Sequence, residues 1–132
     1  MPSTRRAVHL AKPYLLLTAI YFLASFGHFS HNAESICEYP NLPPWLTASK
    51  VYAAWAAQTS VGVLGLHQLR ADKPGRGLAL MAMYAALGLA GLDHYAVAPI
   101  QFHTLAANLS IFGEVIAAAA LLIATLRAML LT

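Results

Sequence analysis

Charged residues are scarce in this sequence. Only 10% of its 132 residues are Asp, Glu, Lys or Arg, whereas 59% are hydrophobic. Globular domains that fold in water carry about 25% charged residues, so the composition excludes an ordinary soluble protein and predicts a membrane protein. The net charge is only +3, and no basic segment is interleaved with aromatic residues. We therefore expect no nucleic-acid partner.

Cysteine is almost absent. Cys37 is the only one in the chain, which excludes an intramolecular disulfide and any Cys-x-x-Cys redox or metal motif. Arg5 and Arg6 precede a long apolar run, but no small-residue cleavage signal follows it. We therefore expect that run to be retained as a membrane anchor.

Four apolar stretches dominate the rest of the sequence. A helix rises 1.5 Å per residue, so about 20 apolar residues cross a hydrocarbon core about 30 Å thick. Each of the four stretches is long enough. The pattern predicts an all-α fold, an integral membrane four-helix bundle in a single domain over 1–132, with helices at about 13–34, 46–70, 77–97 and 104–131.

The basic residues predict the orientation of these helices. Seven of the eight lie on one side of the expected membrane, and the eighth, Lys50, lies on the other. By the positive-inside rule both termini are expected in the cytoplasm, and the expected location is a bacterial inner membrane. The seven are Arg5, Arg6, Lys12, Arg70, Lys73, Arg76 and Arg127.

The first expected helix carries a polar stripe. Steps of three and four residues connect six polar side chains on one face of a 3.6-residue period. Lipid does not tolerate such a face, so we expect it to point into the bundle or a water-containing cavity. The six are Tyr14, Thr18, Tyr21, Ser25, His28 and Asn32.

Histidines and carboxylates gather in the outer half of the expected bundle. Imidazole and carboxylate together are typical ligands of zinc, iron or copper, and helical bundles build such sites from facing side chains. We expect a divalent metal with His28, His94 and His103 as its first ligands, because they come from three separate elements. His31 and Glu34 are candidates for a second metal position.

Glu114 is the most deeply placed acid. It shares a face with His103, about 16 Å below it along the helix. We expect it to be the catalytic general base or acid beside the metal; the alternative is a metal ligand, or a group bonded to Tyr21 or Gln58. Those two residues and Asp93 are expected to contact the ligands without binding the metal.

The connection from Cys37 to Leu46 contains three prolines, Tyr39 and Trp45. Proline stiffens the path, and Tyr and Trp suit the membrane interface. The segment is either a lid over the outer end of the bundle or a plain connector with an aromatic anchor.

These features favour a metal-dependent membrane enzyme, a hydrolase or an oxidoreductase, acting on a lipid-soluble or small apolar substrate. The set of histidines and an acid resembles that of intramembrane zinc hydrolases of the alkaline ceramidase type; those have seven spans, and the resemblance covers reaction class alone. There are four alternatives. The first is a metal-ion binder or transporter, which with only four helices would have to be a homo-oligomer. The others are a haem or quinone protein, an accessory subunit of a membrane complex, and a metal-free polar cluster that holds the helices together.

Overall fold

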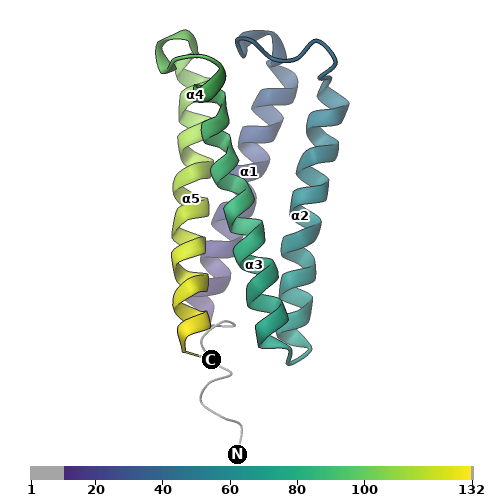
Figure 1. The fold of residues 1–132 in the computed structure, drawn as a ribbon, viewed down its shortest axis with the longest axis vertical. Helices are drawn as coiled ribbons and strands as arrows, with labels where there is room; N and C mark the ends of the chain where they lie inside the picture. Colours follow the sequence, from purple (N-terminus) through teal and green to yellow (C-terminus); the bar gives the residue numbers. More distant parts are fainter. Residues whose placement is uncertain (1–10, 132) are drawn as a thin grey trace, which may run out of the picture.

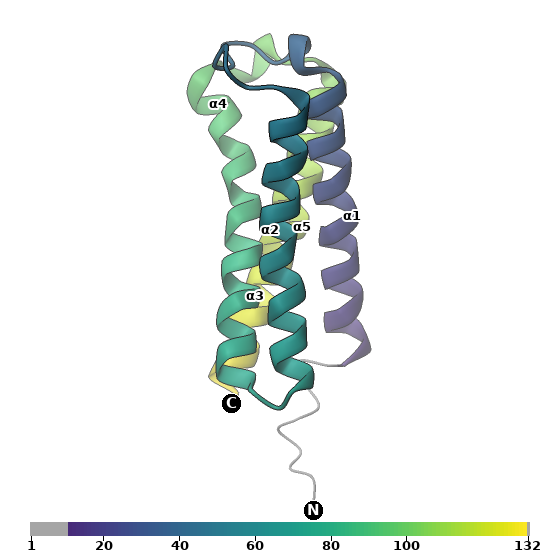
Figure 2. The same cartoon turned by 90° about the vertical axis from the view of Figure 1, so that its right-hand side faces the viewer.

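The computed structural model describes residues 11–131 and is all-helical in that range, with no strand. Four long helical segments run along its long axis (Figures 1 and 2). The expected all-α fold with four helices is confirmed. The segments are α1 (Lys12–Glu34), α2 (Ala48–Arg70), α3 (Pro74–Gly88) continued by η3 (Leu89–Leu92) and α4 (Asp93–Val97), and α5 (Leu105–Leu130).

Local sequence accounts for where these helices begin. Thr47 and Thr104 lie just before α2 and α5, and their hydroxyls accept hydrogen bonds from the backbone N–H of Lys50 (3.4 Å) and Ala107 (3.1 Å). Such N-caps satisfy donors that the first turn leaves without a partner. Pro74 opens α3, where its missing N–H costs nothing.

The helices form a square in which each contacts two neighbours. α1 packs mainly against α5 and α2 against α3, while α3–α5 and α1–α2 contacts close the ring. We call the end where α1 begins and α5 ends the inner end. The outer end carries the α1–α2 connection, with η2 (Ile36–Glu38), and the α4–α5 connection, with η4 (Ile100–Phe102) (Figure 1).

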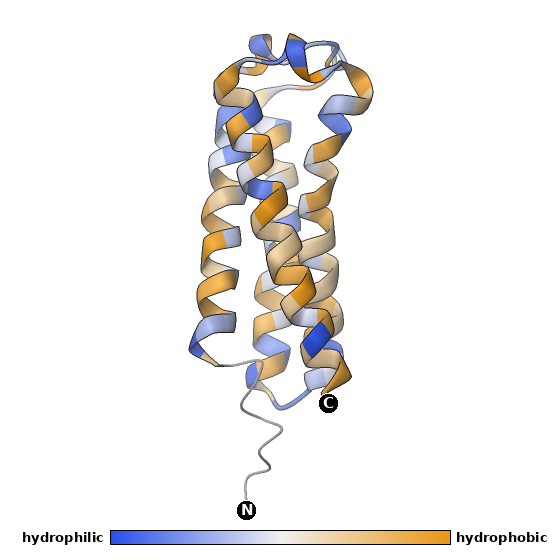
Figure 3. Cartoon of the chain, turned by 90° about the vertical axis from the view of Figure 1, so that its left-hand side faces the viewer, coloured by the Kyte–Doolittle hydropathy of each residue, from blue (hydrophilic) through white to orange (hydrophobic). Residues whose placement is uncertain are grey.

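Three of the four segments are long and apolar enough to cross a membrane: α1, the continuous Pro74–Val97 segment, and α5. α2 is as long as α1 but less apolar, since it has fewer Leu, Ile and Phe side chains. Hydrophilic residues are most frequent at the two ends of the bundle, and a few lie at mid-height (Figure 3). Large apolar side chains such as Leu109 and Ile116 point outward from α5.

Glycines allow close contact between helices. A Cβ on Gly62 would lie 2.7 Å from Tyr84 Cε1, and one on Gly65 would lie 2.9 Å from Met81 Sδ. At Gly88 a Cβ would meet the Tyr21 hydroxyl and Ala118 Cβ. Small residues of this kind bring membrane helices together, and these three set the spacing of α3 from its neighbours.

We predict that Gly88→Ala destabilises the protein by about 1–3 kcal/mol, because the added methyl overpacks the contact between Tyr21 and Ala118. The free energy of unfolding in detergent micelles, measured by SDS titration, checks this. The matched control is Gly113→Ala on α5, where a Cβ meets nothing within 4 Å; it should be neutral or slightly stabilising. Equal stability of the two variants would contradict the packing role of Gly88.

Candidate functional site

The polar stripe of α1 faces the interior of the bundle, as the sequence predicted. All six of its members are buried, and the large side chains on the other faces of α1, such as Leu16 and Leu23, are exposed. The buried six are Tyr14, Thr18, Tyr21, Ser25, His28 and Asn32.

A hydrogen-bond network at mid-height joins all four helices. The Gln58 Nε2 amide on α2 lies 2.8 Å from the Tyr21 hydroxyl and 3.1 Å from Ser25 Oγ, both on α1, and 3.4 Å from Glu114 Oε1 on α5. Tyr21 in turn donates to the backbone carbonyl of Tyr84 on α3 (3.0 Å). The contact between Gln58 and Glu114, one of the alternatives for Glu114, is present, and Tyr21 is linked to Glu114 through Gln58.

Three histidine rings lie next to one another above this network. The centroids of His28 and His94 are 5.3 Å apart, and those of His94 and His103 are 6.1 Å apart. We expected His28 to face both His94 and His103; the structure buries His28 beside His94, and His103 joins the group through its contact with His94. His103 is 6% exposed and packs on the far side of His94 against Tyr95, with ring centroids 5.2 Å apart.

Tyr39 packs against the histidine rings and was not predicted from the sequence to belong to this site. It belongs to the α1–α2 connection, yet it is only 4% exposed, and its ring centroid lies 4.9 to 6.4 Å from those of four histidines. Its hydroxyl lies 2.8 Å from His31 Nδ1 and 3.4 Å from Ser110 Oγ. Burial raises the pKa of Tyr39, so the hydroxyl remains a neutral donor.

The hydrogen bonds of His28 and His103 define which ring nitrogen of each carries the proton. Ser110 Oγ donates its single proton to the Ala107 carbonyl (2.9 Å), so it accepts from His28 Nδ1 at 3.1 Å. His103 Nδ1 donates to the Pro99 carbonyl (3.2 Å). In both neutral rings Nε2 therefore carries a lone pair. His103 Nε2 is buried and has no hydrogen-bond partner in the described residues. A fixed Nδ1–H of this kind is typical of metal-binding histidines.

His94 also presents Nε2 as an acceptor, since Asn32 Nδ2 lies 3.4 Å from it. His28 Nε2 lies 3.7 Å from Glu114 Oε2, and both side chains are almost fully buried. This separation is long for a hydrogen bond.

His31 and Glu34 do not join the group of rings directly. On a helix, steps of three residues fall about 60° short of a full turn, so the series His28, His31, Glu34 rotates out of the bundle. His31 is half-buried and contacts the site through Tyr39; Glu34 is exposed and accepts a hydrogen bond from the Tyr52 hydroxyl (2.7 Å). Asp93 is exposed as well.

A pocket of about 280 Å³ lies beside this group, between α1, α2, η3 and α5. Its wall is mostly apolar and carries a few polar side chains, a composition typical of small-molecule sites. The polar lining consists of His28, Asn32, Lys50, Gln58, His94 and Glu114.

Within residues 11–131, no three or more His, Cys, Asp and Glu side chains already stand in the geometry of a metal site. No family model, curated protein or solved structure matches the chain. Function therefore has to be inferred from the residues around the pocket.

We predict that Gln58→Met, which keeps the shape of the side chain, lowers the free energy of unfolding by about 1–3 kcal/mol. The loss follows because the variant leaves the oxygen atoms of Ser25 and Glu114 without their amide donor inside the bundle. Gln68→Met is the control, since Gln68 Oε1 is buried without a partner in the described range. If both variants unfold at the same SDS fraction as the wild type, the network does not stabilise the bundle.

Proposed function

We propose that the chain is an integral protein of a bacterial inner membrane, with all four helical segments crossing the bilayer and both termini in the cytoplasm. Three segments have the required length and apolarity. α2 can cross as well, because Gln58 is buried against the other helices and the exposed Ser60 hydroxyl donates to the Ala57 carbonyl of its own helix. The orientation rests on the basic residues, which concentrate at the inner end.

Cys37 gives a direct test of this topology, because it is the only cysteine and is exposed at the outer end. We predict that a membrane-impermeant maleimide labels it in intact spheroplasts. In the double variant Cys37→Ser/Ala71→Cys, the thiol lies in the inner turn between α2 and α3 and should be labelled only after lysis. The opposite pattern would reverse the orientation, and labelling of both before lysis would exclude a spanning bundle.

We further propose that the site binds a divalent metal ion through His28 Nε2, His94 Nε2 and Glu114 Oε2. The three side chains come from α1, α4 and α5 and line the same pocket. Two histidines and a glutamate are a ligand set of catalytic zinc sites, which keep a further position open.

One contact supports this assignment, and metal binding would draw the three side chains closer together, because no group of three stands in ligand geometry within residues 11–131. Two ligand atoms about 2.1 Å from a tetrahedral metal lie roughly 3.4 Å apart, close to the 3.7 Å between His28 Nε2 and Glu114 Oε2. The rings of His28 and His94 are neighbours, with centroids 5.3 Å apart. His94 would exchange its long contact with Asn32 for the metal.

The proposed activity is metal-dependent chemistry, hydrolytic or oxidative, on a lipid-soluble substrate. The bound ion would supply a Lewis acid beside the pocket. Gln58 would hold Glu114 by its other carboxylate oxygen, and Ser110 would hold the His28 ring in the orientation that presents Nε2. The apolar walls of the pocket favour an apolar substrate.

Elemental analysis of the purified protein tests the metal proposal. We expect about one equivalent of zinc, iron or copper in the wild type, and at least a tenfold loss of metal in His28→Ala, His94→Ala and Glu114→Gln, because each removes a ligand. Thermal unfolding with and without added metal should show stabilisation of the wild type alone.

Two matched controls separate ligand loss from general damage. His67→Ala removes an exposed histidine at the inner end of α2, and Glu34→Gln neutralises the exposed acid bonded to Tyr52. Both should retain the metal. A wild type that neither contains nor takes up metal, or ligand variants that keep it, would exclude the proposal.

A further inference from the structure

The pocket opens sideways between α2 and the segment formed by α3 and η3. Its lining includes Ala54 on α2 and Leu87 and Ala90 on the facing segment, and all three are exposed on the outside of the bundle. In a spanning bundle this opening lies in the outer half of the hydrocarbon layer. A molecule dissolved in the membrane can therefore reach the pocket without passing through water.

The opening follows from how α2 and α3 are joined. At the inner end a short turn links them, and Gly65 and Gly77 allow close approach to Met81 and Leu69. At the outer end each segment continues into a different connection, and the two diverge toward it in both ribbon views (Figures 1 and 2). The pocket occupies the part where they have separated.

Lys50 lines the pocket near its outer rim. Its Nζ donates to the Trp45 carbonyl (2.9 Å) and lies 5.2 Å from the centroid of the Trp45 ring. An ammonium has three donors, and in the part of the chain that the structure describes Lys50 belongs to no ion pair. The remaining Lys and Arg side chains of residues 11–131 lie at the inner end. Lys50 is thus a positive charge with unused donors above an apolar opening.

We infer that the substrate is a single-chain lipid with an anionic head group, a carboxylate or a phosphate. This inference rests on the proposed function. The head group binds Lys50 Nζ, the reacting bond lies beside His28 and Glu114, and the chain leaves between α2 and α3. Lys50 and Gln58 are eight residues apart, about 12 Å along α2. Because Gln58 contacts Glu114, the substrate must be elongated, with its reacting bond several atoms below the head group.

Binding of radiolabelled lipids to the detergent-purified protein tests the inference. The probes are oleate, oleoyl lysophosphatidate and oleyl alcohol, which share one chain and differ in the head group. We expect at least one anionic probe to bind saturably and about tenfold more tightly than the alcohol, with the preferred one identifying carboxylate or phosphate. Lys50→Gln should abolish this preference, and Lys50→Arg should retain it.

Two further variants complete the design. Lys73→Gln removes an exposed inner-end lysine and should bind like the wild type. Ala90→Trp fills the opening and should weaken all three probes about tenfold or more. Equal binding of the alcohol and both anions, an unchanged preference in Lys50→Gln, or undiminished binding in Ala90→Trp would overturn the inference.

Metal content measured on the same preparations keeps this result separate from the proposed function. Lys50→Gln should retain the full metal content, because Lys50 is not a ligand. If the wild type holds metal but shows no charge-dependent lipid binding, the substrate inference alone fails. If Lys50-dependent binding is present and the metal is not, the lipid site stands and the metal proposal fails.

Discussion

The structure depends on one constraint, which is that polar groups buried among apolar helices must bond to one another. Gln58 is the centre of this arrangement, because its single amide nitrogen lies within hydrogen-bonding distance of oxygens on α1 and α5. Tyr21 extends the network to the backbone of α3. A polar group left without a partner in an apolar interior costs about 1–3 kcal/mol, so sliding or rotating any one helix is unfavourable. The network therefore fixes the relative register of all four helices.

Gly88 shows how packing and hydrogen bonding depend on each other. The Tyr21 hydroxyl can reach the carbonyl of Tyr84 only because Gly88, one turn further along the same segment, has no side chain in its path. The aromatic rings of Tyr21 and Tyr84 then pack with centroids 4.6 Å apart. The contact that the Tyr21 side chain makes with α3 across the diagonal of the bundle thus requires a glycine and a tyrosine together.

The same register places the outer site. His28 lies one turn above Ser25 on the buried stripe of α1, and its ring is held at Nδ1 by Ser110 and faces Glu114 with Nε2. Ser110 also lies next to Tyr39, whose hydroxyl contacts His31. A series of close polar contacts thus runs from the outer end of the bundle to its most deeply buried acid. The site is preorganised because its side chains are positioned by the contacts that stabilise the fold.

Helical periodicity explains which parts could be predicted from the sequence. The stripe of α1, with His28 on it, follows from spacing within a regular helix. The depth of His94 follows from the length of its segment, but η3 separates it from the regular turns of α3, so helical spacing does not fix where its side chain points. The position of Tyr39 does not, because it lies in a connection whose path depends on prolines and on contacts with distant residues. Glu34 follows His28 and His31 at three-residue steps, but accumulated rotation takes it to the outside. Helical spacing predicts that Ser110 and Glu114 share a face of α5. The hydrogen bond between Ser110 and His28 depends on how α1 and α5 pack, and spacing within one helix does not predict it.

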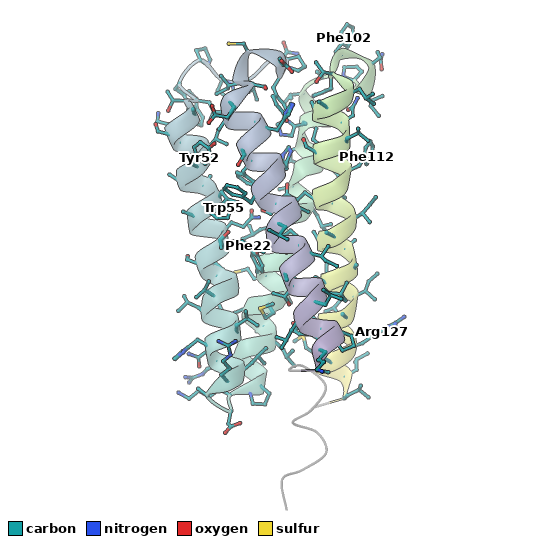
Figure 4. The ribbon with its side chains drawn as sticks, turned by 180° about the vertical axis from the view of Figure 1, so that it is seen from behind. Phe22, Tyr52, Trp55, Phe102, Phe112 and Arg127 are labelled. Carbon is teal, nitrogen blue, oxygen red and sulfur yellow. The ribbon has the colours of Figure 1, made fainter. Side chains whose placement is uncertain are left out.

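The shape of the bundle suits a site below the surface that remains accessible from the side. An apolar groove of about 420 Å³ lies between α1 and α2, beside the inner half of α2. Phe22 of α1 and Trp55 of α2 lie between the two helices toward the outer end, with ring centroids 5.5 Å apart (Figure 4). α2 is thus less closely packed against α1 than against α3. Glycine contacts hold the inner half of α2 against α3. The outer half of α2 has no such contacts and lies further from α3 (Figures 1 and 2). A less apolar helix fits this position, since it supplies Gln58 to the centre and Lys50 to the rim.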